Sequence, residues 1–127
     1  MTREDVFEYA QKEYGTSPEY LWNKWPEYGV LRHSGNRKWY AIVMNVRCKV
    51  LGLDGEGEVD ILDVKCDPAA ADFLIHNEGF LPAYHMNKNN WITVLLDGTV
   101  PNEQILDLID ASYIMTAPKT KKRKEEQ

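Results

Sequence analysis

The sequence predicts an α+β domain whose largely antiparallel sheet carries helices packed on one side. Apolar residues recur at helical spacing near the start and the end of the chain, while short apolar runs fill the middle. Short polar turns separate most of these runs, which favours hairpins over helical crossovers. The chain has 127 residues, of which 43% are hydrophobic, and this is enough for one core.

Helix signals mark three places along the chain. Thr2 can cap a first helix that Gly15 ends, and Asp67 followed by Pro68 is typical of the start of a second helix. Pro101 begins the last helix, whose apolar residues recur at helical spacing. Residues 16–28 form an aromatic-rich connector that we expect to pack on the core rather than to hang free.

The apolar runs predict five strands, at Val30–Arg32, Lys38–Val46, Val59–Val64, Ala83–Met86 and Trp91–Leu96. A turn over residues 34–36 joins the first two strands as a hairpin. Both faces of the second strand are apolar, since one face would carry Trp39, Ala41 and Val43 and the other Tyr40, Ile42 and Met44. This pattern predicts a central strand covered on both sides, or a strand with one exposed aromatic face.

The formal net charge of −5 is unevenly distributed. Residues 119–127 hold five Lys or Arg and two Glu, so the rest of the chain carries a charge near −8. We expect one folded domain over residues 1–117 and a basic, disordered tail over residues 118–127. An acidic body repels polyanions at long range, although one basic face of it can still bind them.

Apolar run length and cysteine usage predict where the protein resides. The longest apolar run, Ile92–Leu96, has the length of a strand, so no membrane partner is expected. Cys48 and Cys66 lack the CxxC spacing of a redox or metal motif. The sequence therefore predicts a cytoplasmic monomer without disulfides.

A dense cluster of unusual residues runs through Lys65–Pro68, Pro82–Lys88 (PAYHMNK), Trp91, Val94–Gly98 and Ser112–Tyr113. This ordered set resembles the MmcQ/YjbR family of small bacterial proteins, and the resemblance covers residues 1–117. It implies a frataxin (CyaY)-like fold and DNA binding through a double wing of hairpins, and it implies no catalytic residues. Such a transfer of function from the fold is an association rather than a chemical argument.

Nucleic-acid binding needs Lys or Arg for phosphates and exposed aromatic rings for stacking. The candidate residues lie on two hairpins: Arg32, Arg37, Lys38 and Trp39 on one, and Lys88, Asn89, Asn90 and Trp91 on the other. Asn side chains at a hairpin tip could reach base edges. The ordinary alternative is that Asn residues form the turn and that both Trp residues are core anchors.

The alternative function is a protein- or small-ligand-binding module with a pocket around His85. Its candidate residues are Lys65, Tyr84, His85, Lys88, Ser112 and Tyr113, which could converge where a strand meets the last helix. The competing interpretation is that His85 and Tyr113 hydrogen-bond to nearby backbone and only stabilise the fold.

Catalysis has the least support in the sequence. Ser112 lacks a nucleophile-elbow context, and the three histidines are scattered without ligand spacing. Cys66 and His85 could still meet in space, which leaves nucleophilic chemistry conceivable. The sequence therefore predicts a non-catalytic protein with no metal and no cofactor.

Overall fold

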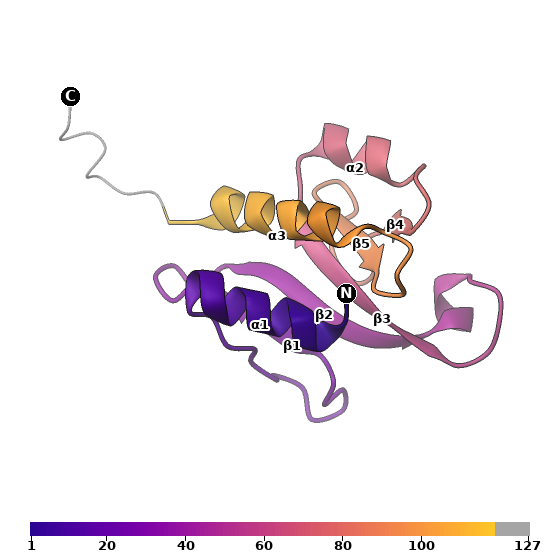
Figure 1. The fold of residues 1–127 in the computed structure, drawn as a ribbon, viewed down its shortest axis with the longest axis horizontal. Helices are drawn as coiled ribbons and strands as arrows, with labels where there is room; N and C mark the ends of the chain where they lie inside the picture. The colour runs from indigo at the N-terminus through magenta and orange to yellow at the C-terminus, as the bar shows by residue number, and fades with distance from the viewer. Residues whose placement is uncertain (119–127) are drawn as a thin grey trace.

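The computed structural model describes residues 1–118. Five strands form one antiparallel sheet in the order β1-β2-β3-β5-β4 (Figure 1). The strands are β1 Gly29–Arg32, β2 Trp39–Arg47, β3 Glu58–Lys65, β4 Phe80–Pro82 and β5 Trp91–Leu95. The helices are α1 Arg3–Tyr14, α2 Pro68–Leu74 and α3 Asn102–Thr116, and a short 3₁₀ helix, η1, spans Cys48–Leu51. The α+β class and the antiparallel sheet predicted from the sequence are confirmed.

Local chemistry sets the ends of the helices. Thr2 and Asp5 exchange side-chain and backbone hydrogen bonds in a capping box at the start of α1. Gly15 ends this helix in a left-handed conformation with φ 66°, as its position in the sequence predicted. The Asp67 carboxylate accepts from the amide of Ala70, and Pro68 occupies the first turn of α2.

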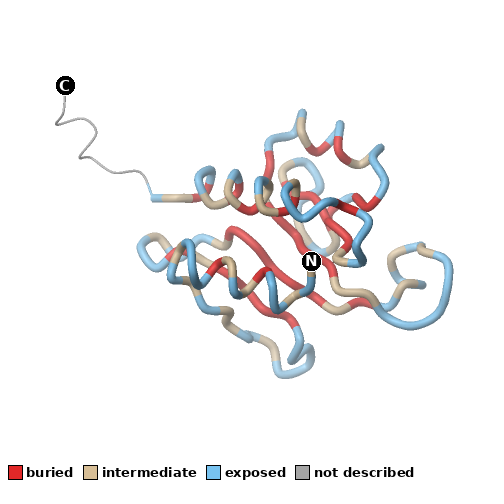
Figure 2. The backbone as a smooth tube through the Cα atoms, viewed as in Figure 1, coloured by how far each residue is buried: buried red, intermediate tan, exposed pale blue. Residues whose placement is uncertain are grey.

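The sheet separates two apolar clusters, and buried residues lie along the strands (Figure 2). On one face, α1 and α3 lie side by side over the sheet, and Val6 and Ile109 are fully buried there (Figure 1). Tyr9 and Tyr14 both donate hydrogen bonds to the Asp110 carboxylate, which ties α1 to α3. The opposite face is covered by the connector over residues 16–28 and by the loop over residues 83–90.

A β-bulge in β2 corrects the predicted assignment of faces. Leu31 pairs with Ala41 and Arg32 pairs with Trp39, so Tyr40 is the extra residue opposite β1. The side chain of Tyr40 consequently joins Ala41 in the helix-side cluster, whereas Trp39 packs with the cluster on the opposite face. Regular alternation of side chains along the strand had predicted Trp39 and Ala41 on the same face. Strand β2 is covered on both sides, as one of the two predicted alternatives required.

The fourth strand lies earlier than predicted. The sequence suggested Ala83–Met86, but the paired residues are Phe80–Pro82. Gly79, with φ 91°, turns the chain directly into this strand, and a Cβ at this position would lie 2.5 Å from Val100. Beyond Pro82 the chain leaves the ladder, since the amide of Tyr84 donates to the side chain of Thr93 rather than to the backbone of β5. His85 then adopts φ 64°, which no strand residue has.

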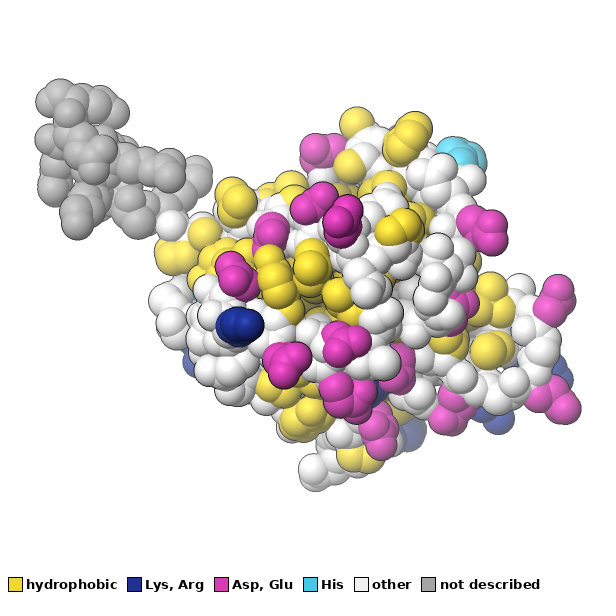
Figure 3. Space-filling model, viewed as in Figure 1, with side chains coloured by type: hydrophobic (Ala, Val, Ile, Leu, Met, Phe, Trp, Pro, Cys, Tyr) yellow, Lys and Arg dark blue, Asp and Glu magenta, His cyan; other side chains and the backbone are white. Residues whose placement is uncertain are grey.

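Acidic side chains spread over the face that carries α1 and α3 (Figure 3). Glu4, Glu8 and Glu13 of α1 and Glu103 and Asp107 of α3 are exposed. This face therefore opposes the approach of a polyanion. From residue 119 on, the basic tail predicted over residues 118–127 lies outside the described residues.

Candidate functional site

The connector over residues 16–28 is fixed to the sheet at defined points. Glu19 and Val30 exchange two backbone hydrogen bonds of 2.9 Å. The Glu19 carboxylate also accepts from Nε and Nη2 of Arg32, at 2.9 and 2.6 Å. Further along, Arg3 of α1 donates to the carbonyl of Glu27 at 2.8 Å. These contacts hold the connector in one conformation and place its aromatic side chains over the sheet.

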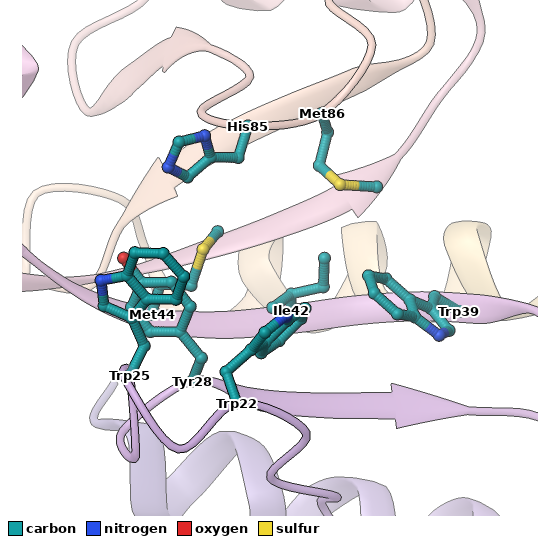
Figure 4. Close-up of a pocket in the computed structure, with 8 residues that line it drawn as sticks. All are labelled: Trp22, Trp25, Tyr28, Trp39, Ile42, Met44, His85 and Met86. Atoms are coloured by element: carbon teal, nitrogen blue, oxygen red, sulfur yellow. The ribbon is translucent and has the colours of Figure 1, made fainter.

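Four aromatic rings form one wall of a pocket on this face (Figure 4). The ring of Trp22 lies edge-on to Trp39, with centroids 5.8 Å apart, and edge-on to Tyr28, with centroids 6.0 Å apart. Trp25 is parallel to Tyr28, with centroids 5.6 Å apart. Edge-to-face and offset parallel contacts are the favourable geometries for aromatic pairs, so the wall is well ordered.

The floor and the opposite wall come from other elements. Ile42 and Met44 of β2 provide the floor, and the bulge at Tyr40 brings Trp39 onto the same face. His85 and Met86 lie across the pocket from the aromatic rings (Figure 4). The pocket has a volume of about 270 Å³ and a mainly apolar lining. We call it the aromatic pocket; its residues are Trp22, Trp25, Tyr28, Trp39, Ile42, Met44, His85 and Met86.

The loop that carries His85 is held by specific bonds. The amide of Tyr84 donates to Oγ1 of Thr93 at 2.9 Å, and Lys88 Nζ donates to the carbonyl of Ala83 at 2.9 Å. His85 itself is exposed and has a positive φ of 64°, which is uncommon outside glycine and is often found at functional sites. The loop therefore presents the imidazole to the pocket without using it to hold the fold.

A buried carboxyl group lies beneath this loop. Asp63 is fully buried, and its Oδ1 accepts from Oγ1 of Thr93 at 2.5 Å, while Oδ2 has no hydrogen-bond partner among the described residues. Burial raises the pKa of Asp63 to about 7, against the opposing effects of Thr93 and of the Lys88 charge. Asp63 is paired across the ladder with Ile42, a floor residue of the aromatic pocket.

The structure divides the residues predicted to bind nucleic acid. Arg37, Lys38 and Asn89 are exposed. Arg32 is paired with Glu19, and Lys88 is bonded to a backbone carbonyl of its own loop. The two hairpin loops lie at the same end of the sheet, since β2 and β5 both begin there, beside the end of β3.

The two predicted stacking residues are not equivalent. Trp91 is only 8% exposed, so its indole offers little surface on which a base could stack. Trp39 is partly exposed and belongs to the aromatic pocket instead of the hairpin tip. Asn90 is half-buried, and its carbonyl accepts from the amide of Cys66 at 2.9 Å.

The six residues of the predicted ligand pocket do not converge. Ser112 and Tyr113 lie on the helix side of the sheet, where Ser112 bonds to backbone and Tyr113 stacks on Tyr14 at 3.7 Å. Tyr84 and His85 lie on the opposite side. The sheet separates the two groups, so a pocket that joins His85 to Ser112 is not formed. A pocket beside His85 does exist, but its walls come from the connector and from β2.

Among the described residues, the fold does not bring together the side chains that nucleophilic catalysis or metal binding would need. Cys66 belongs to the helix-side cluster and is buried, which raises the pKa of its thiol, whereas His85 lies on the opposite face. Within residues 1–118, no three His, Cys, Asp or Glu side chains come together as a metal site requires. No helix in the same range is long and apolar enough to cross a membrane.

The fold and the pocket define a small α+β protein with one antiparallel sheet, whose second face holds an aromatic pocket. The family model YjbR matches residues 12–115, and the chain belongs to this family. It is 49% identical to the uncharacterised protein YyaQ of Bacillus subtilis, over 91% of this chain and 98% of that protein. The predicted family membership is therefore confirmed.

Solved structures of similar proteins share the fold. A crystal structure of a Pseudomonas syringae protein is 44% identical and superposes with a TM-score of 0.90, covering 92% of this chain and all of that one. The crystal structure of the Deinococcus radiodurans protein DR2400 is 27% identical, with a TM-score of 0.72 over 98% of this chain and 86% of that one. These comparisons support the architecture and assign no function.

Proposed function

We propose that this protein is a non-catalytic binding domain that takes a small, flat, largely apolar ligand in the aromatic pocket. The observation that carries the proposal is the wall of four aromatic rings facing an exposed imidazole. Small-molecule sites are typically apolar concavities with a few placed polar groups, and His85 supplies such a group here. A flat ring would stack against the indoles while a hydroxyl or carbonyl on it bonds to His85.

The four tryptophans provide the test. Three of them, Trp22, Trp25 and Trp39, line the pocket, whereas Trp91 is buried elsewhere and serves as an internal reference. Titration with 1-naphthol, indole or p-cresol, followed by the indole N–H signals in ¹H–¹⁵N NMR spectra, should shift three signals and leave the fourth. If none of the three compounds moves the pocket indoles selectively, the proposal is wrong.

A matched pair of variants makes the test specific to the pocket. Trp25→Ala should weaken binding about tenfold or more, since losing one aromatic contact removes roughly 1.5 kcal/mol. Leu21→Ala is the control, because Leu21 has a similar exposure of 44%, lies in the same connector and does not line the pocket. Equal losses in the two variants would indicate damage to the connector rather than loss of a binding wall.

Nucleic-acid binding is the second candidate, and the shared position of the two hairpin loops favours it. In this proposal Arg37 and Lys38 contact phosphates and Asn89 approaches a base, at the end of the sheet where both loops lie. The frataxin-like and double-wing descriptions remain predictions from the family resemblance. We also propose that the protein is a cytoplasmic monomer, as the sequence predicts.

Salt dependence tests this candidate. Binding of a labelled DNA duplex, followed by fluorescence anisotropy between roughly 50 and 200 mM salt, should be weakened by the double variant Arg37→Ala/Lys38→Ala, with the logarithmic salt slope falling by about 2. The control is Arg47→Ala/Lys49→Ala, which removes two exposed bases at the opposite end of β2. An unchanged affinity and slope in the first variant would remove DNA as a ligand of these loops.

A further inference from the structure

A second, polar cleft lies at the β1 edge of the sheet, between the start of the connector and the β1–β2 hairpin. Its volume is about 180 Å³, roughly the space of six waters. It is lined by Tyr14, Gly15, Thr16, Ser17, Glu19, Arg32, His33, Ser34, Arg37 and Tyr113. Two guanidinium groups and one carboxylate give this lining a net positive charge, in a body whose overall charge is strongly negative. We refer to it as the arginine cleft.

The Glu19 carboxylate holds the guanidinium of Arg32 in a fixed orientation beside this cleft. Its bonds to Glu19 engage Nε and Nη2, which fixes the plane of the guanidinium. A guanidinium has five N–H donors, so the donors on Nη1 remain for another acceptor. A positioned fork of this kind suits oxyanions, because two parallel N–H groups match two oxygens of a carboxylate or phosphate.

Arg37 carries the second positive charge of the cleft, and its backbone conformation is unusual. Its φ is 65°, and its amide donates to the carbonyl of His33 at 3.1 Å in the hairpin turn. A left-handed conformation at a residue with a Cβ costs energy and is found where the surroundings determine the direction of the side chain. Here the exposed side chain of Arg37 borders the cleft opposite the connector.

A buried hydroxyl beside the cleft lacks a partner. Oη of Tyr40 makes no hydrogen bond of good geometry among the described residues, although the side chain of Thr16, which lines the cleft, lies close enough to lower the pKa of Tyr40 against the larger, opposite effect of burial. The ring packs against Tyr14, His33 and Tyr113, all of which line the cleft, with centroids 4.9 to 6.0 Å away. Buried polar atoms are normally satisfied, so the Thr16 hydroxyl stands between the Tyr40 Oη and a guest in the cleft, and it can bond to either.

We propose that the arginine cleft binds a small oxyanion of the phosphate class, gripped by Arg37 and Arg32 and approached by the hydroxyls of Thr16 and Ser34. The site shares no lining residue with the aromatic pocket and does not depend on the function proposed for that pocket. The phosphate can come from a small phosphorylated molecule or from a nucleic-acid backbone. Both sources present the same tetrahedral group to the two guanidinium forks.

The test is a titration of the full chain with inorganic phosphate at constant ionic strength, followed by ¹H–¹⁵N NMR. Amide signals of residues 15–17, 19 and 33–37 should shift, while the indole signals of the aromatic pocket stay in place. Arg37→Gly should raise the dissociation constant for phosphate at least tenfold. Because glycine accepts the positive φ, this variant should keep or raise the melting temperature, so a loss of binding is not a loss of fold.

Lys49→Ala is the control, since Lys49 is an exposed base beyond the far end of β2 that does not line the cleft and has no part in the nucleic-acid proposal. It should change the dissociation constant less than twofold. Equal weakening in both variants, or shifts spread over the whole surface, would overturn the proposal. Two further titrations separate the sources of the phosphate: glycerol 3-phosphate represents a small phosphorylated molecule, and a 12-nucleotide strand without terminal phosphates represents a nucleic-acid backbone. Only the source that fits the cleft should reproduce the shifts at residues 33–37.

Discussion

Asp63→Asn is expected to stabilise the protein at pH 8, because it removes a buried carboxylate whose pKa is raised from 3.8 to about 7. The raised pKa corresponds to about 4 kcal/mol, and burying the new amide N–H groups takes back about 1–3 kcal/mol of it. Below about pH 4 the carboxyl is neutral in both folded and unfolded chains, so it has no effect on the pH dependence. Between about pH 4 and 7 only the unfolded chain is ionised. The unfolded state then binds fewer protons, and the free energy of unfolding falls as the pH rises.

Denaturant unfolding at pH 4, 6 and 8 measures this effect. The wild-type protein should lose stability across this range, and the asparagine variant should be flatter. Asp60→Asn on the same strand is the control with the opposite sign, because the bonds from Arg3 and Asn45 lower the pKa of Asp60. A lower stability of Asp63→Asn at pH 8 would mean that the ionised form is favourably bound, with Lys88 as the nearby charge.

The predictable part of the fold rests on signals within a few residues of each other. Thr2 with Asp5, Asp67 with Pro68 and the glycine after α1 act locally, and the structure has helices where these signals place them. The β1–β2 hairpin follows in the same way from its short polar turn. Each of these features could be predicted because its chemistry depends on neighbours along the chain.

The bulge at Tyr40 could not be predicted from the residues of β2 alone. Apolar side chains occupy both faces of this strand, so the sequence pattern carries no mark of where the alternation shifts by one residue. The consequence for the site is large, since the shift moves Trp39 into the aromatic pocket. The same limit applies to the predicted strand Ala83–Met86, since its apolar pattern carries no mark of the positive φ that His85 adopts.

Composition also did not predict the partners of two of the basic residues. The sequence shows Arg32 in a stretch without acids, but the structure brings Glu19 against it from the other side of a turn. Lys88 likewise turns back to its own loop. One part of the aromatic pocket could be predicted, because the sequence shows an aromatic-rich connector that packs on the core. Its meeting with His85, some sixty residues further on, depends on the topology of the sheet.

Ser112→Ala is expected to lower the free energy of unfolding by about 2–4 kcal/mol, because it leaves two buried backbone groups without partners. Oγ of Ser112 donates to the carbonyl of Tyr40 at 2.6 Å and accepts from the amide of Lys65 at 2.9 Å. The hydroxyl thus bridges β2 and β3 beside the bulge, where the direct ladder stops at the pair of Ala41 and Val64. It also fixes α3 to the sheet.

Helix propensity predicts the opposite sign, since alanine favours a helix more than serine does. A large loss of stability in Ser112→Ala therefore reports the bridge and not the helix. Hydrogen exchange gives a second measure, in which the amide of Lys65 should lose protection by far more than amides of β4. If the variant is as stable as the wild-type protein, a water molecule replaces the hydroxyl. Ser112 is one of the residues that carry the family resemblance. Support of the bulge would then not be the reason for a serine at this position.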